Sequence, residues 1–110
     1  SNRGALYLLQ KNYAAALADL DRAVRINPRS VDGYINRGAV YLEQGTYDQA
    51  LKNYHQALAL QSDHRDALYN RAIVHYKTGR NLLALADIEK ILEIDPDWEP
   101  AKLFREQLMR

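Results

Sequence analysis

An asparagine followed by an arginine and a small residue occurs three times along the chain. The copies begin at Asn2, Asn36 and Asn70, so that they are equally spaced. An asparagine amide has two N–H donors and one carbonyl acceptor, and it can therefore meet the C=O and the N–H of an extended chain together. Two alternatives follow: the amides form a ladder that contacts a ligand, or they bond across the protein's own helices.

Other residues that could carry chemistry are few. The three histidines, His55, His64 and His75, lie at no metal-ligand spacing, and the chain has no cysteine. The serines lie at the N-terminus or at expected turns, without a histidine and an acid to activate them. The glycines do not form a phosphate-binding loop. We therefore expect no catalytic residue, no metal site and no cofactor.

Composition narrows the class of partner. The length of 110 residues suits one domain, and the formal net charge of the chain is +1. Nucleic acid and acidic membranes are usually met by a concentrated basic face, so the near-balance of charge argues against both. No apolar run approaches the roughly 18 residues of a membrane span, so no membrane insertion is expected. We expect a soluble protein in the cytoplasm, with the periplasm as the alternative, because a cysteine-free domain suits both.

The whole chain follows an internal repeat. Segments 2–30, 36–64 and 70–98 align at a constant offset, and a period of about 34 residues is typical of helical repeat proteins. The pattern within each unit indicates two helices, because apolar residues recur at steps of three and four and Gly or Pro interrupts these stretches. No period-two alternation persists, so no strand is expected. The all-α fold should contain about seven helices, at residues 1–10, 14–27, 31–44, 48–61, 65–78, 82–95 and 98–109.

Small residues recur with the same period. The first helix of each unit carries Gly4, Gly38 or Ala72 near its middle. Glycine inside a helix costs up to about 1 kcal/mol relative to alanine, so its repetition indicates close approach of two backbones. The second helices have matching alanines beside large residues, and small against large is how helices interlock. These residues are Ala16, Ala50 and Ala84, with Leu20, Tyr54 and Ile88.

These repeated positions resemble the tetratricopeptide repeat. The unit of that family has an aromatic, then Leu-Gly and Tyr, then a later Ala, an aromatic and a Pro. Two departures are Ser62, where Pro is usual, and His75, where Tyr is usual; we therefore expect a packing role for His75. The second unit matches the pattern at Tyr34, Gly38, Tyr41, Ala50 and Tyr54.

The resemblance implies an α-solenoid, a right-handed superhelix of antiparallel helix pairs in one domain, residues 1–110. Its units would be residues 1–30, which lack the start of a first helix, then 31–64 and 65–98. A capping helix would follow at 99–110.

In this family the first helix of each unit lines a concave groove. The resemblance therefore implies a non-catalytic scaffold that binds a peptide segment of a partner protein, with the asparagines as a ladder along the groove. In the cap, Leu103 and Gln107 would close the groove's end. The expected groove residues are Asn2, Asp32, Ile35, Asn36, Ala39, Leu42, Asp66, Tyr69, Asn70, Ile73 and Tyr76.

Some members of the family hold the C-terminal carboxylate of chaperone tails with lysines, asparagines and an arginine of three first helices. Here only Asn36 matches that set, and Ser1 and Ala5 occupy the places of the first pair. Asp32 and Asp66 would repel a carboxylate. We expect no chaperone-tail binding, and instead an apolar, weakly basic peptide.

Arg37 and Arg71 stand where the family commonly has Leu. We expect their stems to pack at the seam with the second helix of the preceding unit. Their charged ends should reach acids or carbonyls there, with Asp19 or Asp21 as the candidate for Arg37.

Two other functions remain open at this point. The chain could form a homo-oligomer through its convex face or its N-terminal edge, where Leu6 and Leu9 form an apolar side. It could also be the accessory domain of a larger enzyme whose chemistry lies outside these residues.

Overall fold

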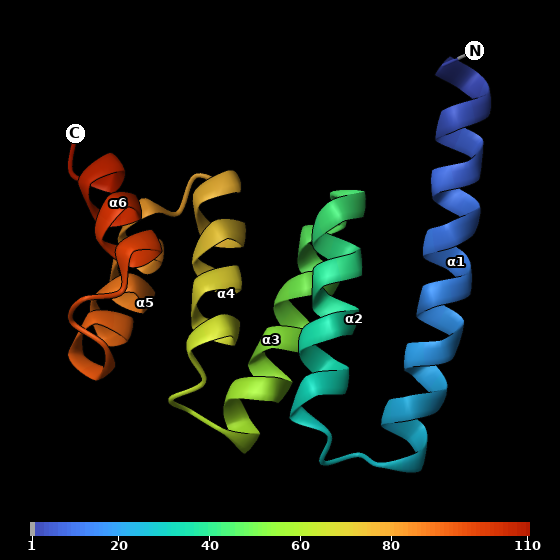
Figure 1. Cartoon of the computed structure of the whole chain (residues 1–110), viewed down its shortest axis with the longest axis horizontal. Helices are drawn as coiled ribbons and strands as arrows, with labels where there is room; N and C mark the ends of the chain where they lie inside the picture. The colour runs from blue at the N-terminus through green and yellow to red at the C-terminus, as the bar shows by residue number, and fades with distance from the viewer. Residues whose placement is uncertain (1) are drawn as a thin grey trace.

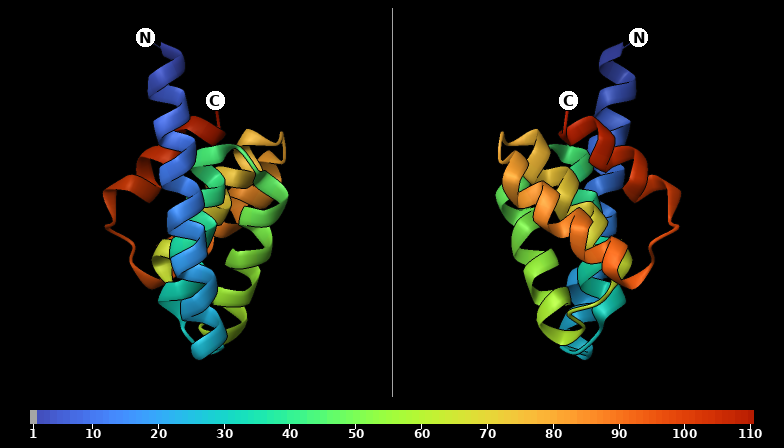
Figure 2. Two further views of the ribbon diagram at one scale, coloured as in Figure 1. Left: turned by 90° about the vertical axis from the view of Figure 1, so that its right-hand side faces the viewer. Right: turned by 90° about the vertical axis from the view of Figure 1, so that its left-hand side faces the viewer.

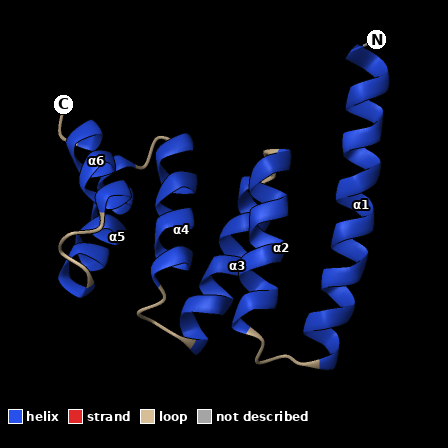
Figure 3. Ribbon diagram, viewed as in Figure 1, coloured by secondary structure: helices blue, strands red, loops and turns tan. Residues whose placement is uncertain are grey.

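The computed structural model describes the backbone of residues 2–110 and the side chains of residues 12–110. Within that range the chain forms six α-helices joined by short connections, without a strand (Figure 1; Figure 3). The helices follow one another across a molecule of 39 × 37 × 22 Å. They are α1 (Asn2–Ile26), α2 (Val31–Gln44), α3 (Tyr47–Leu60), α4 (Arg65–Lys77), α5 (Asn81–Ile94) and α6 (Glu99–Leu108).

Local residues explain where the helices begin and end. Ser30 precedes α2, and its hydroxyl accepts a hydrogen bond from the Gly33 N–H at 3.1 Å, which satisfies a free donor of the first turn. Gly45 follows α2 with a φ of 77°, and Gly79 lies between α4 and α5 with a φ of 79°. This left-handed conformation costs other residues about 1–2 kcal/mol, so glycine is favoured where one helix must turn into the next.

The first two expected helices are one helix in the structure. We expected helices at residues 1–10 and 14–27, whereas α1 runs unbroken over Asn2–Ile26. Lys11 stands one repeat period before Gly45 in the sequence. A lysine there disfavours the left-handed turn that separates α2 from α3, and the helix continues. The expectation of about seven helices thus becomes six.

The helices stack so that α2, α4 and α6 share one side. Each helix packs on its neighbours in the chain, and α2 also contacts α4. Aromatic rings of α4 contact α6. The helices α3 and α5 cover the other side, and a view along the stack places α3 and α6 on opposite sides of the molecule (Figure 2). We call the open side of α2, α4 and α6 the inner surface.

The core depends on small residues set against large ones. A Cβ atom on Gly38 would lie only 2.7 Å from Cε1 of Tyr54, whose side chain is fully buried. Ala50 and Ala57 on α3 are also fully buried. The predicted close approach of α2 and α3 is therefore confirmed. The largest fully buried side chains are Tyr54, Leu68, Ile88, Ile91 and Val74.

Candidate functional site

The inner surface carries most of the expected groove residues. Asp32, Asn36, Asp66 and Tyr76 are exposed. Five more are half-buried: Ala39, Leu42, Tyr69, Asn70 and Ile73. Because residues three and four apart share one face of a helix, these side chains form two parallel rows, one on α2 and one on α4.

Two kinds of expected residue are not on this surface. Ile35 is only 8% exposed and belongs to the core, where Tyr34 and Val31 pack beside it, so the structure corrects its assignment to the groove. A residue at the edge of an apolar stripe can turn either way, and the sequence pattern did not distinguish the two. The side chains of Asn2, Gly4, Leu6 and Leu9 lie outside the described residues.

Asn70 is half-buried on α4, near Tyr54 of α3. The Tyr54 hydroxyl is buried and has no hydrogen-bond partner among the described residues. Burial raises the pKa of Tyr54, whereas the nearby Asn70 amide acts in the opposite direction. Asn36, which is exposed, has more freedom to contact a ligand.

A hollow of about 340 Å³ lies where α4 meets α6. Tyr69 forms edge-to-face contacts with Trp98 and Phe104, at centroid distances of 5.2 and 6.0 Å. Tyr76 contacts Phe104 in the same manner at 5.6 Å, and its hydroxyl accepts a hydrogen bond from Gln107 at 3.0 Å. These contacts hold the rings in place around the hollow. We call it the α4–α6 pocket; its lining residues are Tyr69, Glu99, Pro100, Leu103, Phe104 and Gln107.

The repeat period could have identified the α6 side of this pocket, but the expected groove included only part of that side. Leu103 and Gln107 were expected to close the groove, whereas Phe104 was missed. Phe104 stands one repeat period after Asn70, as Leu103 does after Tyr69. Extending the repeat by one more helix therefore identifies α6 as the next first helix. Its inner row has an aromatic ring where α2 and α4 have asparagine.

The repeated arginines connect helices away from the inner surface. Arg37 on α2 donates two hydrogen bonds to neighbouring helices. Its Nη1 donates to Asp21 Oδ1 on α1 at 3.0 Å, and its Nε donates to Asn53 Oδ1 on α3 at 2.5 Å. The predicted contact of Arg37 with Asp21 is thus confirmed. The contact with Asn53, in the helix that follows, was not expected.

Arg71 makes the equivalent contacts one repeat later. Its Nε and Nη2 donate to the two carboxylate oxygens of Asp87 on α5 at 2.9 and 2.6 Å. Its Nη1 lies 3.2 Å from Nδ1 of His55 on α3. His55 and Asp87 stand one period after Asp21 and Asn53, so each arginine bridges the helices before and after its own. We call these sets the Arg37 brace and the Arg71 brace; the equal offset of both partners from each arginine was their sequence signal.

His75 lies beside the Arg71 brace and is buried, in agreement with its expected packing role. Its Nε2 is 3.9 Å from Asp87 Oδ2, and its Nδ1 has no partner in the described part of the chain. Burial lowers the pKa of His75; the Asp87 carboxylate raises it, and the Arg71 cation lowers it further. Burial and Arg71 likewise lower the pKa of His55. Both histidines are therefore favoured in the neutral form.

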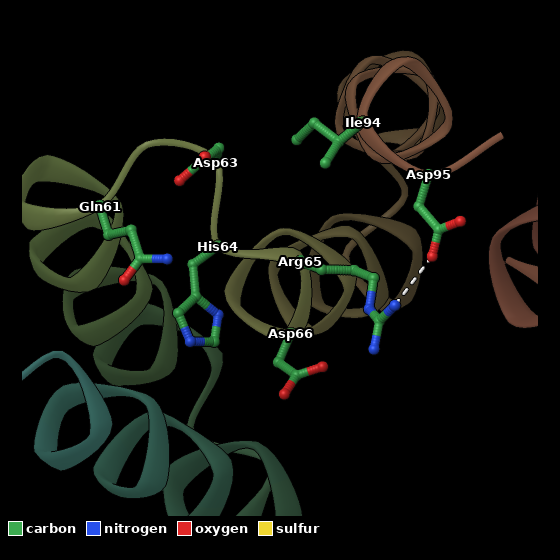
Figure 4. A pocket seen from close by; sticks show the side chains of 7 residues that line it. All are labelled: Gln61, Asp63, His64, Arg65, Asp66, Ile94 and Asp95. Atoms are coloured by element: carbon green, nitrogen blue, oxygen red, sulfur yellow. Dashed lines mark hydrogen bonds and ion pairs between the residues drawn. The ribbon is translucent and has the colours of Figure 1, made fainter.

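A second hollow, of about 430 Å³, lies at the turn between α3 and α4 and beside the end of α5 (Figure 4). Three of its polar residues, His64, Arg65 and Asp95, are engaged in the fold. An Arg65 Nη1 donates to Asp95 Oδ2 at 2.8 Å, and the guanidinium lies 4.4 Å from the centre of the Trp98 ring. His64 Nδ1 accepts from the Ala67 N–H at 3.4 Å and so caps α4. This hollow is best explained by the junction between helix pairs.

Two further findings limit the site. Among the residues whose structure is described, no group of three or more histidine, aspartate or glutamate side chains is placed to hold a metal ion. None of the helices in this part of the chain combines the length and the apolar character that crossing a membrane requires.

The chain belongs to the tetratricopeptide repeat family. A family model described as "Tetratricopeptide repeat" matches residues 35–97, and one described as "TPR repeat" matches residues 4–45. The six-helix fold is accordingly that of an α-solenoid. No curated protein sequence matches the chain.

Solved structures show the same fold. The TPR domain of Arabidopsis OM64 superposes with a TM-score of 0.83 and 25% identity, covering 96% of this chain and 86% of that one. TTC0263, a thermophilic TPR protein of Thermus thermophilus, gives a TM-score of 0.84 and 31% identity, covering 91% of this chain and 51% of that one. The first TPR of Spaghetti (RPAP3), solved with an HSP90 peptide, gives 0.85 and 20% identity, covering 98% and 86%.

Proposed function

We propose that the inner surface binds a peptide segment of a partner protein, and that the chain is a non-catalytic interaction scaffold. The observation that carries the proposal is the pair of rows on α2 and α4. Asn36 and Tyr76 remain exposed there, Ile73 remains half-buried, and none of the three belongs to the buried core clusters. Amide, aromatic and aliphatic side chains in parallel rows suit an extended peptide, whose backbone and side chains can be met together.

The charges on this surface favour a basic peptide. Asp32, Glu43 and Asp66 are exposed on α2 and α4. The exposed cations of these two helices are Lys77 and Arg65, and Arg65 is already paired with an acid, at 2.8 Å. Opposite charge steers a partner to a surface and selects against partners of like charge. We therefore propose that acidic C-terminal tails do not bind here. The HSP90 peptide SRMEEVD, which is bound by the first TPR of RPAP3, serves as the negative control.

A display selection tests the proposal. Wild-type protein would be used to select peptides from a random library, beside an Asn36→Ala, Asn70→Ala double variant. Gln56→Ala, on the exposed face of α3, is the matched control, and circular dichroism would establish that all three proteins fold. We expect wild type and control to select the same peptides and the double variant to lose them.

Two outcomes of that selection oppose the proposal. If wild type selects no peptide, the inner surface is not a peptide site. If the double variant selects the same peptides equally well, the asparagines serve the fold, and the binding surface lies elsewhere.

A second candidate function, self-association, is supported by the open face of α1. Leu20 is half-buried and Ala23 is exposed, whereas the residues one period later, Tyr54 and Ala57, are fully buried under a first helix. An apolar stripe that is covered in one unit and open in another suits contact with a second copy. Sedimentation over a wide concentration range would test it. Leu20→Gln should abolish any dimer, and Leu82→Gln, at an exposed leucine of α5, should not; a wild-type monomer at every concentration excludes this candidate.

A further inference from the structure

We propose that the α4–α6 pocket is the specificity pocket of the inner surface and that it holds an arginine or lysine side chain of the bound peptide. This inference rests on the proposed function and adds the chemical class of the ligand. The pocket lies where the inner row of α4 meets that of α6, so a peptide along the rows would reach it. Its volume of about 340 Å³ is within the range of ligand sites.

The walls of the pocket suit a side chain with an apolar stem. Tyr69 and Phe104 supply aromatic surface, and Leu103 and Pro100 supply aliphatic surface. Leu103 is 61% exposed, which leaves its side chain free for a contact. The stems of arginine and lysine cover apolar surface of this kind while the charged end stays near water.

The rim of the pocket supplies the negative charge. Glu99 lines it with a side chain that is 67% exposed. Its ion pair with Lys102, at 3.3 Å, joins residues one turn apart on α6. An exposed pair of this type is weak, so the carboxylate remains available to a second cation. No lysine or arginine is among the lining residues, so the lining itself offers no ion-pair partner to an anionic side chain.

The chain itself shows the same combination of groups at Trp98. The Arg65 guanidinium lies 4.4 Å from the centre of that ring and pairs with Asp95 at 2.8 Å. An aromatic face and a carboxylate together hold this cation. Tyr69, Phe104 and Glu99 offer an incoming cation the same two groups.

The test uses the peptides selected on wild-type protein. We expect them to share a basic residue at one fixed position. Replacing that residue with citrulline or norleucine should weaken binding about tenfold, since both the cation–π contact and the ion pair are lost. Glu99→Gln should weaken it about threefold, and Leu103→Lys should weaken it further, because it places a like charge on the wall of the pocket.

Glu106→Gln is the matched control, because Glu106 is exposed on the same helix and does not line the pocket. If the selected peptides lack a shared basic residue, or if Glu99→Gln and Glu106→Gln have the same effect, the assignment of the pocket is wrong while the peptide-binding function stands. If no peptide is selected, both proposals fail.

Discussion

The Arg71 brace offers the sharpest test of how sequence relates to stability in this protein. The side chain of Asp87 is only 8% exposed, and Arg71 donates two hydrogen bonds to its carboxylate, at 2.9 and 2.6 Å. An Arg71→Leu variant retains an apolar stem of the type common in the family, but it leaves Asp87 buried. His75 is a poor substitute for the lost cation, because its Nε2 is 3.9 Å away and its ring is favoured neutral.

The expected cost follows from that geometry. Removing one partner of a buried ion pair costs about 3–5 kcal/mol, since the other charge stays buried without compensation. Arg71 is itself partly exposed, so we expect a value near the lower end, about 3 kcal/mol. Urea unfolding followed by circular dichroism would measure the free energy of unfolding.

The Arg37 brace is the internal control. Its acid, Asp21, has a 47% exposed side chain and accepts one bond at 3.0 Å. Asn53 is buried but neutral, and it keeps its hydrogen bond to the Gln49 carbonyl at 2.8 Å. Arg37→Leu should therefore cost about 2 kcal/mol, less than Arg71→Leu, because it removes one exposed ion pair and one hydrogen bond from the guanidinium to the uncharged Asn53 amide.

A second variant separates loss of the pair from loss of packing. In the Arg71→Leu background, Asp87→Asn removes the uncompensated charge and should restore about 1–2 kcal/mol. Equal costs for Arg37→Leu and Arg71→Leu would refute the reasoning, as would the absence of any recovery with Asp87→Asn.

Three further predictions concern the packing, a turn and the pH dependence. Gly38→Ala should destabilise the protein by about 1 kcal/mol, because the steric cost of a Cβ 2.7 Å from Tyr54 exceeds the gain from the higher helix propensity of alanine. That cost should disappear in a Tyr54→Ile background, which reproduces the residue of the next unit. Thermal unfolding of wild type, the two single variants and the double variant measures the coupling between the two positions. Gly45→Ala should cost about 1 kcal/mol in the same assay because its φ is 77°, and a neutral effect would show that the turn rearranges. The lowered pKa of His75 means that the unfolded chain binds this proton more readily, so the contribution of His75 to the free energy of unfolding should fall as the pH drops below about 6.5. His55, whose pKa is also lowered, should contribute a slope of the same sign. His75→Gln should therefore reduce the slope without abolishing it, and an unchanged slope would assign it to other groups.

The helical repeat itself was readable from the residues. The constant period, the alternation of small and large residues, and the absence of strand patterns all depend on near neighbours along a helix, and helices obey such local rules. The bounds of α2 were predicted without error because Ser30 and Gly45 mark its ends by local chemistry. The role of Gly38 was predictable for the same reason, since a glycine inside a helix has a cost that only close packing explains.

The tertiary structure decided which side chains meet across helices. Ile35 lies in the core and not on the inner surface, and a periodic stripe cannot place a residue at its own edge. Phe104 closes a pocket with Tyr69 because α6 packs on α4, a contact between residues far apart in the sequence. Asp87 is buried under Arg71, whereas Asp21 is half exposed under Arg37, although the two arginines occupy equivalent positions. The repeat makes the units alike in sequence, but burial depends on how many helices cover each one, and only the assembled stack contains that information.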